Sequence, residues 1–120
     1  MSEISKIRVN DTDYNIKSLP KIIKNTATAT GMNLEDNTVR RFVNTVTNLG
    51  VSLPSEYNEL FQSELIFKSG TTATSLTYDE SIKWSGDDIK DNVFVPVANK
   101  IYNILFWYDG FNMNAVVRGV

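Results

Sequence analysis

The side chains best suited to chemistry in this chain are three carboxylates in the run Gly86-Asp-Asp-Ile-Lys-Asp-Asn92. Asp87, Asp88 and Asp91 supply the hard oxygen ligands that calcium prefers. The run lacks the alternating acidic positions, the central glycine and the distant glutamate of the known calcium loop. Aspartate, asparagine and glycine are also the usual residues of turns. We therefore expect a turn leading into a short helical bend capped by Asp87, with no metal and no cofactor.

A second acidic pair, Asp79 and Glu80, has the residue types used in glycoside hydrolysis, where two carboxylates flank one bond. Adjacent strand residues point to opposite faces, so this pair is expected to form a turn. The chain has no histidine and no cysteine, which removes the commonest general base and every thiolate nucleophile. It also has no serine-centred elbow and no phosphate-binding loop. We expect a protein without enzymatic activity.

The two tryptophans are the candidates for binding. An exposed tryptophan can stack on a sugar ring or anchor a protein interface, whereas burial in a core is the commoner outcome for a large aromatic residue. Core packing is the favoured interpretation for Trp84. For Trp107 both interpretations stay open, because its expected neighbour across the last hairpin is the polar Asn112.

That hairpin is the clearest local pattern. A two-residue turn at Asp109-Gly110 would pair Tyr108 with Phe111 and Phe106 with Met113. One side then contains only apolar or aromatic residues: Tyr102, Ile104, Phe106, Tyr108, Phe111, Met113, Ala115 and Val117. The other side is mixed: Ile101, Asn103, Leu105, Trp107, Asn112, Asn114, Val116 and Arg118. A slip of one residue would mix the two sides. We expect the side with Trp107, Asn112 and Asn114 to face outward.

The N-terminal part is expected to hold another hairpin, from Ile4 to Ile16, around the turn residues 10–13. A lone two-stranded hairpin is marginally stable in water, so this one should dock on the rest of the chain or on a partner. Residues 25–31, rich in threonine and alanine, resemble a linker.

The central part has helical spacing. Apolar residues recur three and four positions apart between residues 39 and 49, which predicts an amphipathic helix ending at Gly50. Its apolar face would be a core or subunit interface. The members of this face are Val39, Phe42, Val43, Val46 and Leu49. A second short helix is expected after Pro54, with Tyr57, Leu60 and Phe61 on its inner face.

From Glu64 onward the period changes to two, which predicts strands at 65–68, 74–78 and 81–84, and an edge strand at 93–95 before Pro96. The expected fold class is α+β: an N-terminal β-hairpin, short central helices and a C-terminal antiparallel β-sheet or sandwich. The expected divisions are residues 1–31 for the hairpin and linker, 32–63 for the helices and 64–120 for the β module.

Length and composition favour one compact domain, alone or with a small appendage. The chain has 120 residues, 42% of them hydrophobic, and a formal net charge of −2, which suits a globular protein. Its basic residues form no stripe, so we expect no nucleic-acid partner. No apolar run is long enough to span a membrane, and the N-terminus lacks signal-peptide features. We therefore expect synthesis as a soluble cytoplasmic product.

Several motifs in the second half of the chain carry a family resemblance. They are Phe67-Lys-Ser-Gly-Thr-Thr-Ala-Thr74, Ile82-Lys-Trp-Ser-Gly-Asp-Asp88, Asn99-Lys-Ile-Tyr102 and Tyr108-Asp-Gly110. Their order resembles a C-terminal β module in virion proteins of tailed bacteriophages, particularly phages of gut bacteria, including the crAss-like group. The resemblance covers roughly residues 65–120. More weakly, Lys6–Tyr14 is similar to N-terminal segments of phage fibre and baseplate proteins.

The resemblance implies a structural component of the virion: a tail or head fibre, or a capsid or tail accessory protein. It implies assembly as a dimer or trimer with other virion proteins, and it supplies no catalytic residues. The chain leaves no room for a long fibre shaft, so a small accessory or fibre-anchoring protein is favoured. The alternative function is a module that binds carbohydrate on a cell surface, such as a host glycan, through exposed aromatic residues.

Overall fold

The described part of the chain is built entirely from strands. The computed structural model describes residues 6–9 and 12–15 by their backbone and residues 19–120 in full. Across these ranges it contains no helix. The predicted α+β class is therefore wrong, and the fold is all-β.

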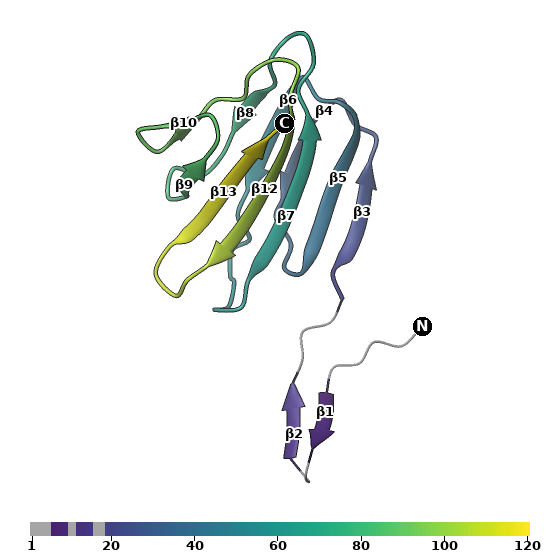
Figure 1. The fold of residues 1–120 in the computed structure, drawn as a ribbon, viewed down its shortest axis with the longest axis vertical. Coiled ribbons are helices and arrows are strands. Elements are labelled where there is room, and N and C mark those ends of the chain that lie inside the picture. Colours follow the sequence, from purple (N-terminus) through teal and green to yellow (C-terminus); the bar gives the residue numbers. More distant parts are fainter. Residues whose placement is uncertain (1–5, 10–11, 16–18) are drawn as a thin grey trace.

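Two larger sheets and two strand pairs make up the fold (Figure 1). The six-stranded sheet has the order β3 (Lys21–Asn25), β5 (Thr38–Thr45), β7 (Gln62–Lys68), β12 (Ile101–Tyr108), β13 (Met113–Gly119) and β9 (Lys83–Gly86). The three-stranded sheet has the order β4 (Ala29–Asn33), β6 (Asn48–Ser52) and β8 (Ser75–Thr77). The pairs are β1 (Lys6–Val9) with β2 (Thr12–Asn15), and β10 (Ile89–Lys90) with β11 (Val93–Phe94).

The chain from β3 to β8 winds between the two larger sheets. Strands β3, β5 and β7 lie parallel in one sheet, while β4, β6 and β8 lie parallel in the other. Parallel neighbours need a crossover connection, which is usually a helix. Here each crossover is a strand of the opposite sheet, so the chain forms successive coils as in a β-solenoid. The six-stranded sheet contains both parallel and antiparallel pairs, because β12 runs antiparallel to β7 and β13, whereas β9 runs parallel to β13.

The core lies between the two sheets. One cluster of buried residues joins Met32, Leu49 and Val51 of the small sheet to the inner side of the large sheet. The large sheet contributes the alternate positions of its central strands, which are Leu65, Phe67, Tyr102, Ile104, Phe106, Ala115 and Val117. Burial of every second residue is typical of a sheet with one face on the core and the other exposed to solvent.

The predicted helix at 39–49 is wrong: its residues form β5 and β6. Along β5 the register against β7 shifts, because Arg41 is opposite Ile66 while Thr45 is opposite Lys68. Four positions on β5 therefore match two on β7, which is an irregularity of the bulge type. It leaves Phe42 and Val46 buried four positions apart, a spacing that resembles one turn of a helix.

The linker and the second helix were also predicted wrongly. The linker at 25–31 contains the end of β3 and the start of β4. The stretch after Pro54 contains no helix and makes a turn in which Asn58 Oδ1 accepts the Leu60 N–H at 2.9 Å. Of the proposed inner face, Phe61 is buried and Leu60 is 74% exposed. The strand predicted at 74–78 is β8, and it belongs to the small sheet and not to the sheet that contains β7.

The C-terminal hairpin has the predicted sidedness but a register shifted by two residues. Tyr108 is opposite Met113, and Phe106 is opposite Ala115. Residues 109–112 form the loop, in which the Asp109 carboxylate accepts the N–H groups of Phe111 at 2.8 Å and Asn112 at 2.7 Å. These bonds make a four-residue loop favourable over the expected two-residue turn. A shift of two preserves each residue's face, except that Phe111 leaves the core side and is 88% exposed.

Strands β1 and β2 pair with each other antiparallel, with Ile7 opposite Tyr14, as the N-terminal hairpin prediction requires. Neither strand joins the sheets formed by β3–β13. The predicted ends of this hairpin, Ile4 and Ile16, and part of its turn lie outside the described residues.

Candidate interaction surface

The side of the six-stranded sheet that faces away from the core, here called the outer face, is the main candidate surface. Register partners on neighbouring strands form rows across it. One row contains Ile22, Val39, Glu64, Leu105 and Val116 on β3, β5, β7, β12 and β13. We call it the apolar row, since four of its five residues are aliphatic.

The apolar row is substantially open to solvent. Ile22 is 68% exposed, Leu105 41% and Val116 39%. Aligned aliphatic residues from four strands differ from the scattered apolar residues that any protein surface shows. This arrangement makes the outer face the candidate surface for an interaction.

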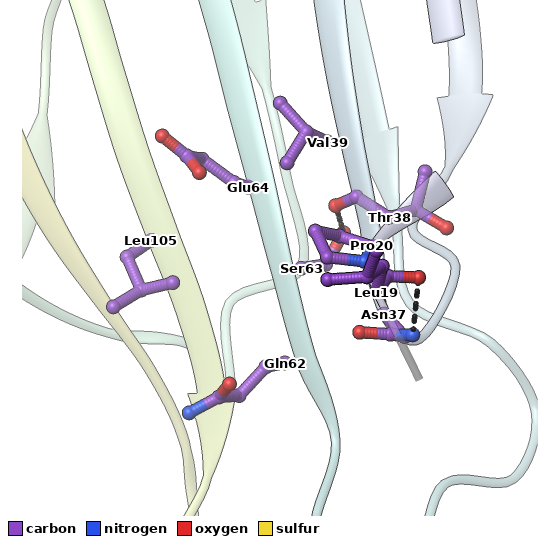
Figure 2. Close-up of a pocket in the computed structure, with 9 residues that line it drawn as sticks. All are labelled: Leu19, Pro20, Asn37, Thr38, Val39, Gln62, Ser63, Glu64 and Leu105. Carbon is purple, nitrogen blue, oxygen red and sulfur yellow. Dashed lines mark hydrogen bonds between the residues drawn. The ribbon is translucent and has the colours of Figure 1, made fainter. Parts of the chain in front are cut away.

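A shallow hollow of about 380 Å³ lies beside the middle of this row (Figure 2). Val39, Glu64 and Leu105 line it from the sheet, and Leu19 and Pro20, which precede β3, line it from the side. Asn37 Nδ2 donates to the Leu19 carbonyl at 3.2 Å, which ties that wall to the turn before β5. A second hollow, of about 450 Å³, contains Leu105, Val116 and Arg118. Leu105 therefore stands between two depressions of the outer face.

Basic residues surround the apolar row. The adjacent row of register partners contains Lys24, Arg41, Ile66, Asn103 and Arg118. Lys68 and Lys83 occupy further outward positions on β7 and β9, and all five basic side chains are exposed. Glu64 is the one carboxylate on these outward strand positions, with Asp87 at the rim of the second hollow. The outer face is therefore positive, although the chain has a net charge of −2.

Trp107 also lies on the outer face, beside Gln62 and Asn114 as register partners. It is half-buried and lines a hollow of about 290 Å³ together with Glu59, Gln62 and Tyr108. Asn114 Nδ2 donates to Asp109 Oδ2 at 2.9 Å and so is held by the loop. Asn112 is exposed within that loop and is not the register partner of Trp107.

Trp84 lies in the core, where its side chain is 7% exposed. Its ring packs against Tyr78, Phe94 and Phe106, with centroids 4.7, 5.1 and 5.9 Å away. Its Nε1 has no hydrogen-bond partner within the described residues. This placement keeps Trp84 away from any surface partner.

The other candidate interface residues divide between the core and the surface. Phe42 and Val46 are buried in the core of this chain, at 4% and 0% exposed. Val39 is half-buried and belongs to the apolar row. The structure therefore brings Val39 and Trp107 onto one face and separates them from Phe42 and Val46.

The acidic run at Asp87–Asp91 forms two tight turns around β10 in place of the expected helical bend. Asp87 Oδ2 accepts the Gly119 N–H at 3.0 Å. Asp88 Oδ2 accepts from Lys100 Nζ at 2.9 Å and from the Tyr102 hydroxyl at 2.6 Å. Across the described residues no group of three or more acidic side chains is placed to hold a metal ion. The carboxylates tie loops to the sheet.

Tyr102 and Asp88 alter each other's titration. Burial, followed by the hydrogen bond to Asp88, raises the pKa of Tyr102 to about 12. The hydrogen bond from Tyr102, followed by the one from Lys100, lowers the pKa of Asp88 from 3.8. The neutral phenol and the ionised carboxylate are thus the favoured forms. This is a structural network, since the Tyr102 oxygen also accepts the Val97 N–H at 2.8 Å.

Three of the motifs that carry the family resemblance lie close together near the start of β12, whereas Tyr108-Asp-Gly110 lies at its other end. The run Ser69–Thr74 is held by Ser69 Oγ, which accepts the Thr74 N–H at 3.0 Å, and by Thr74 Oγ1, which donates to the Val46 carbonyl at 2.7 Å. The Ser69 N–H donates to the Lys100 carbonyl at 2.8 Å. These bonds join the coils of the fold to its C-terminal hairpin.

Two features escaped the sequence analysis. The apolar row joins residues from five strands, and only its β12–β13 part was visible as the mixed side of a hairpin. The second feature is Asn92, whose Oδ1 accepts the Trp84 N–H at 2.7 Å and whose Nδ2 donates to the Ile82 carbonyl at 3.1 Å. Its side chain thus substitutes for a strand beside β9. The pair Asp91-Asn92 predicted a turn, but nothing in the sequence indicated that Asn92 would bond to Ile82 and Trp84.

Comparisons with known proteins identify no relative: no protein-family model matches the chain, and no curated protein matches it. No helix in the described ranges is long and apolar enough to cross a membrane.

Proposed function

We propose that this chain is a non-enzymatic structural protein of a tailed-bacteriophage virion, acting in assembly through the outer face. The observation that carries the proposal is the apolar row, which presents four aliphatic side chains from four strands to solvent. The resemblance of residues 65–120 to virion β modules supports the particle as the place of assembly. A tail or head fibre component and a capsid or tail accessory protein both fit.

The chemistry of the outer face suits a protein partner. Protein interfaces have an apolar centre, from which water is excluded, and a polar rim. Here Val39, Leu105 and Val116 would supply the centre, while Arg41 and Arg118 would supply the rim. Fully burying one exposed leucine or valine stabilises a complex by about 1.5–3 kcal/mol before the costs of association.

Replacing Leu105 and Val116 together by glutamate should abolish association with particles, because docking would then bury two carboxylates without partners. The measurement is co-sedimentation of the purified chain with particles of the phage that encodes it, followed by mass spectrometry. Val97→Glu is the matched control, since Val97 is 40% exposed but lies on a loop. Particle association that survives the double substitution, or a wild-type chain absent from particles, would contradict the proposal.

A second candidate function, binding of a cell-surface saccharide, is favoured by the hollow at Trp107. An indole face packs on the apolar side of a pyranose ring, while carboxylate and amide groups bind its hydroxyls. Trp107 with Glu59 and Gln62 provides these groups around about 290 Å³. This site would operate beside the apolar row on the same outer face.

Trp107→Ala should reduce glycan binding at least about tenfold, as expected for loss of an aromatic contact, and should leave the fold intact. A glycan array followed by calorimetry on any ligand found would measure it. Phe111→Ala is the control, because Phe111 is an exposed aromatic residue outside the hollow. Equal losses in the two variants, or no array signal for the wild type, would exclude a saccharide site at Trp107.

A further inference from the structure

A surface away from the outer face also combines exposed apolar residues with charge. A hollow of about 600 Å³, here called the acidic hollow, lies between the end of β8 and the turn and strand that contain Asp91 and Val93. Its rim includes Val93 and Val95, which are 48% and 62% exposed. Glu80 and Asp91 line it, and both are exposed, while no lysine or arginine is among its lining residues.

The two surfaces are complementary. The outer face presents protruding aliphatic side chains, Ile22 and Leu105 among them, inside a set of exposed basic residues. The acidic hollow presents a depression with apolar walls and two carboxylates. Apolar contact supplies affinity, and opposite charge supplies steering and register.

The two surfaces are also separate. No residue lines both the acidic hollow and either of the two hollows at Leu105. The small β10–β11 pair beside the acidic hollow lies on the β9 side of the fold, whereas β3 forms the opposite edge (Figure 1). One copy can therefore use both surfaces at once.

We propose that the partner of the outer face is the acidic hollow of a second copy of this chain. The contact is heterologous, because two different surfaces meet, so copies join head to tail into a ring or an open filament. This inference rests on the proposed assembly function and specifies its partner. Arg41 and Arg118 of one copy would approach Glu80 and Asp91 of the next.

The test is the mass of the purified full chain, measured by light scattering across a concentration series at low and high salt. The wild type should form oligomers that weaken about tenfold or more in apparent affinity at high salt, because the interfacial charges are screened. A wild-type chain that stays monomeric at every concentration overturns the proposal.

Two charge variants test which surfaces meet. Arg41→Glu with Arg118→Glu cancels the positive charge of the outer face and places two carboxylates at the proposed contact, and Glu80→Lys with Asp91→Asn makes the hollow basic. Asp91 has φ 52°, which asparagine tolerates. Each variant alone should be monomeric, whereas an equimolar mixture should assemble. Wild-type assembly by either variant alone, or no assembly in a mixture of correctly folded variants, overturns the proposal.

The failure of this inference is distinguishable from the failure of the proposed function. A monomeric chain that still associates with particles overturns head-to-tail contact and leaves virion assembly in place. If the charge variants assemble only when mixed, but the wild-type chain never associates with particles, head-to-tail contact is supported and the virion function is overturned.

Discussion

Gly86→Ala should destabilise the protein by more than about 3 kcal/mol, the range of severe backbone and packing defects. Gly86 has φ +105°, which side-chain-bearing residues rarely adopt. A Cβ at this position would lie 2.1 Å from the Val117 carbonyl oxygen and 2.8 Å from the Val117 nitrogen. The same oxygen accepts the Asp87 N–H at 2.9 Å. Alanine therefore forces β9 away from β13 and breaks the bond that anchors the acidic run.

Urea unfolding followed by tryptophan fluorescence measures this effect, since Trp84 lies on β9 within the core. Gly31→Ala is the matched control, because a Cβ on Gly31 meets no atom within 4 Å. That substitution should change stability by no more than about 1 kcal/mol, and in the stabilising direction if anything. Equal unfolding midpoints for the two variants would show that β9 and β13 are not in close contact in solution.

The contact between Gly86 and Val117 shows which features of the fold could be predicted from the sequence and which could not. Gly86 and the aspartates after it were recognisable as a turn, because their residue types favour turns locally. The requirement for glycine comes from Val117, which is distant in the sequence, and no local pattern contains it. By contrast, the buried side of β12 was predicted correctly from the alternation at 102–108, because this pattern depends only on residues two positions apart.

The errors lie where tertiary pairing overrides local spacing. Phe42 and Val46 have helical spacing because the register shift of β5 leaves these two core residues four positions apart. The many β-branched residues of this stretch opposed a helix, and they were the more informative signal. The apolar row was hidden for a related reason. Ile22, Val39 and Leu105 come from three separated strands. The parallel pairing of β3, β5 and β7 and the antiparallel pairing of β12 with β7 align them.

Tyr102→Phe should cost about 1–3 kcal/mol, the range for leaving a buried polar group without its partner. Tyr102 is fully buried, and its hydroxyl links Asp88 on one loop to the Val97 N–H on another. Phenylalanine fills nearly the same space, so packing is kept and only these two bonds are lost. Tyr57→Phe, which removes a hydroxyl from a half-buried tyrosine outside the network, should have the smaller effect.

The pH dependence separates this network from packing. The pKa of Tyr102 is raised from 10.0 to about 12 in the folded protein, so the unfolded chain releases its proton first as the pH rises. The network's stabilisation is therefore complete below pH 10 and is lost between pH 10 and 12. Asp88 has the opposite sign: its folded pKa lies below 3.8, so its contribution is lost as the pH falls through that region. Urea midpoints recorded from pH 3 to 12 should therefore converge for wild type and Tyr102→Phe at the alkaline end. A constant difference up to pH 12 would contradict a raised pKa of Tyr102 in the folded protein.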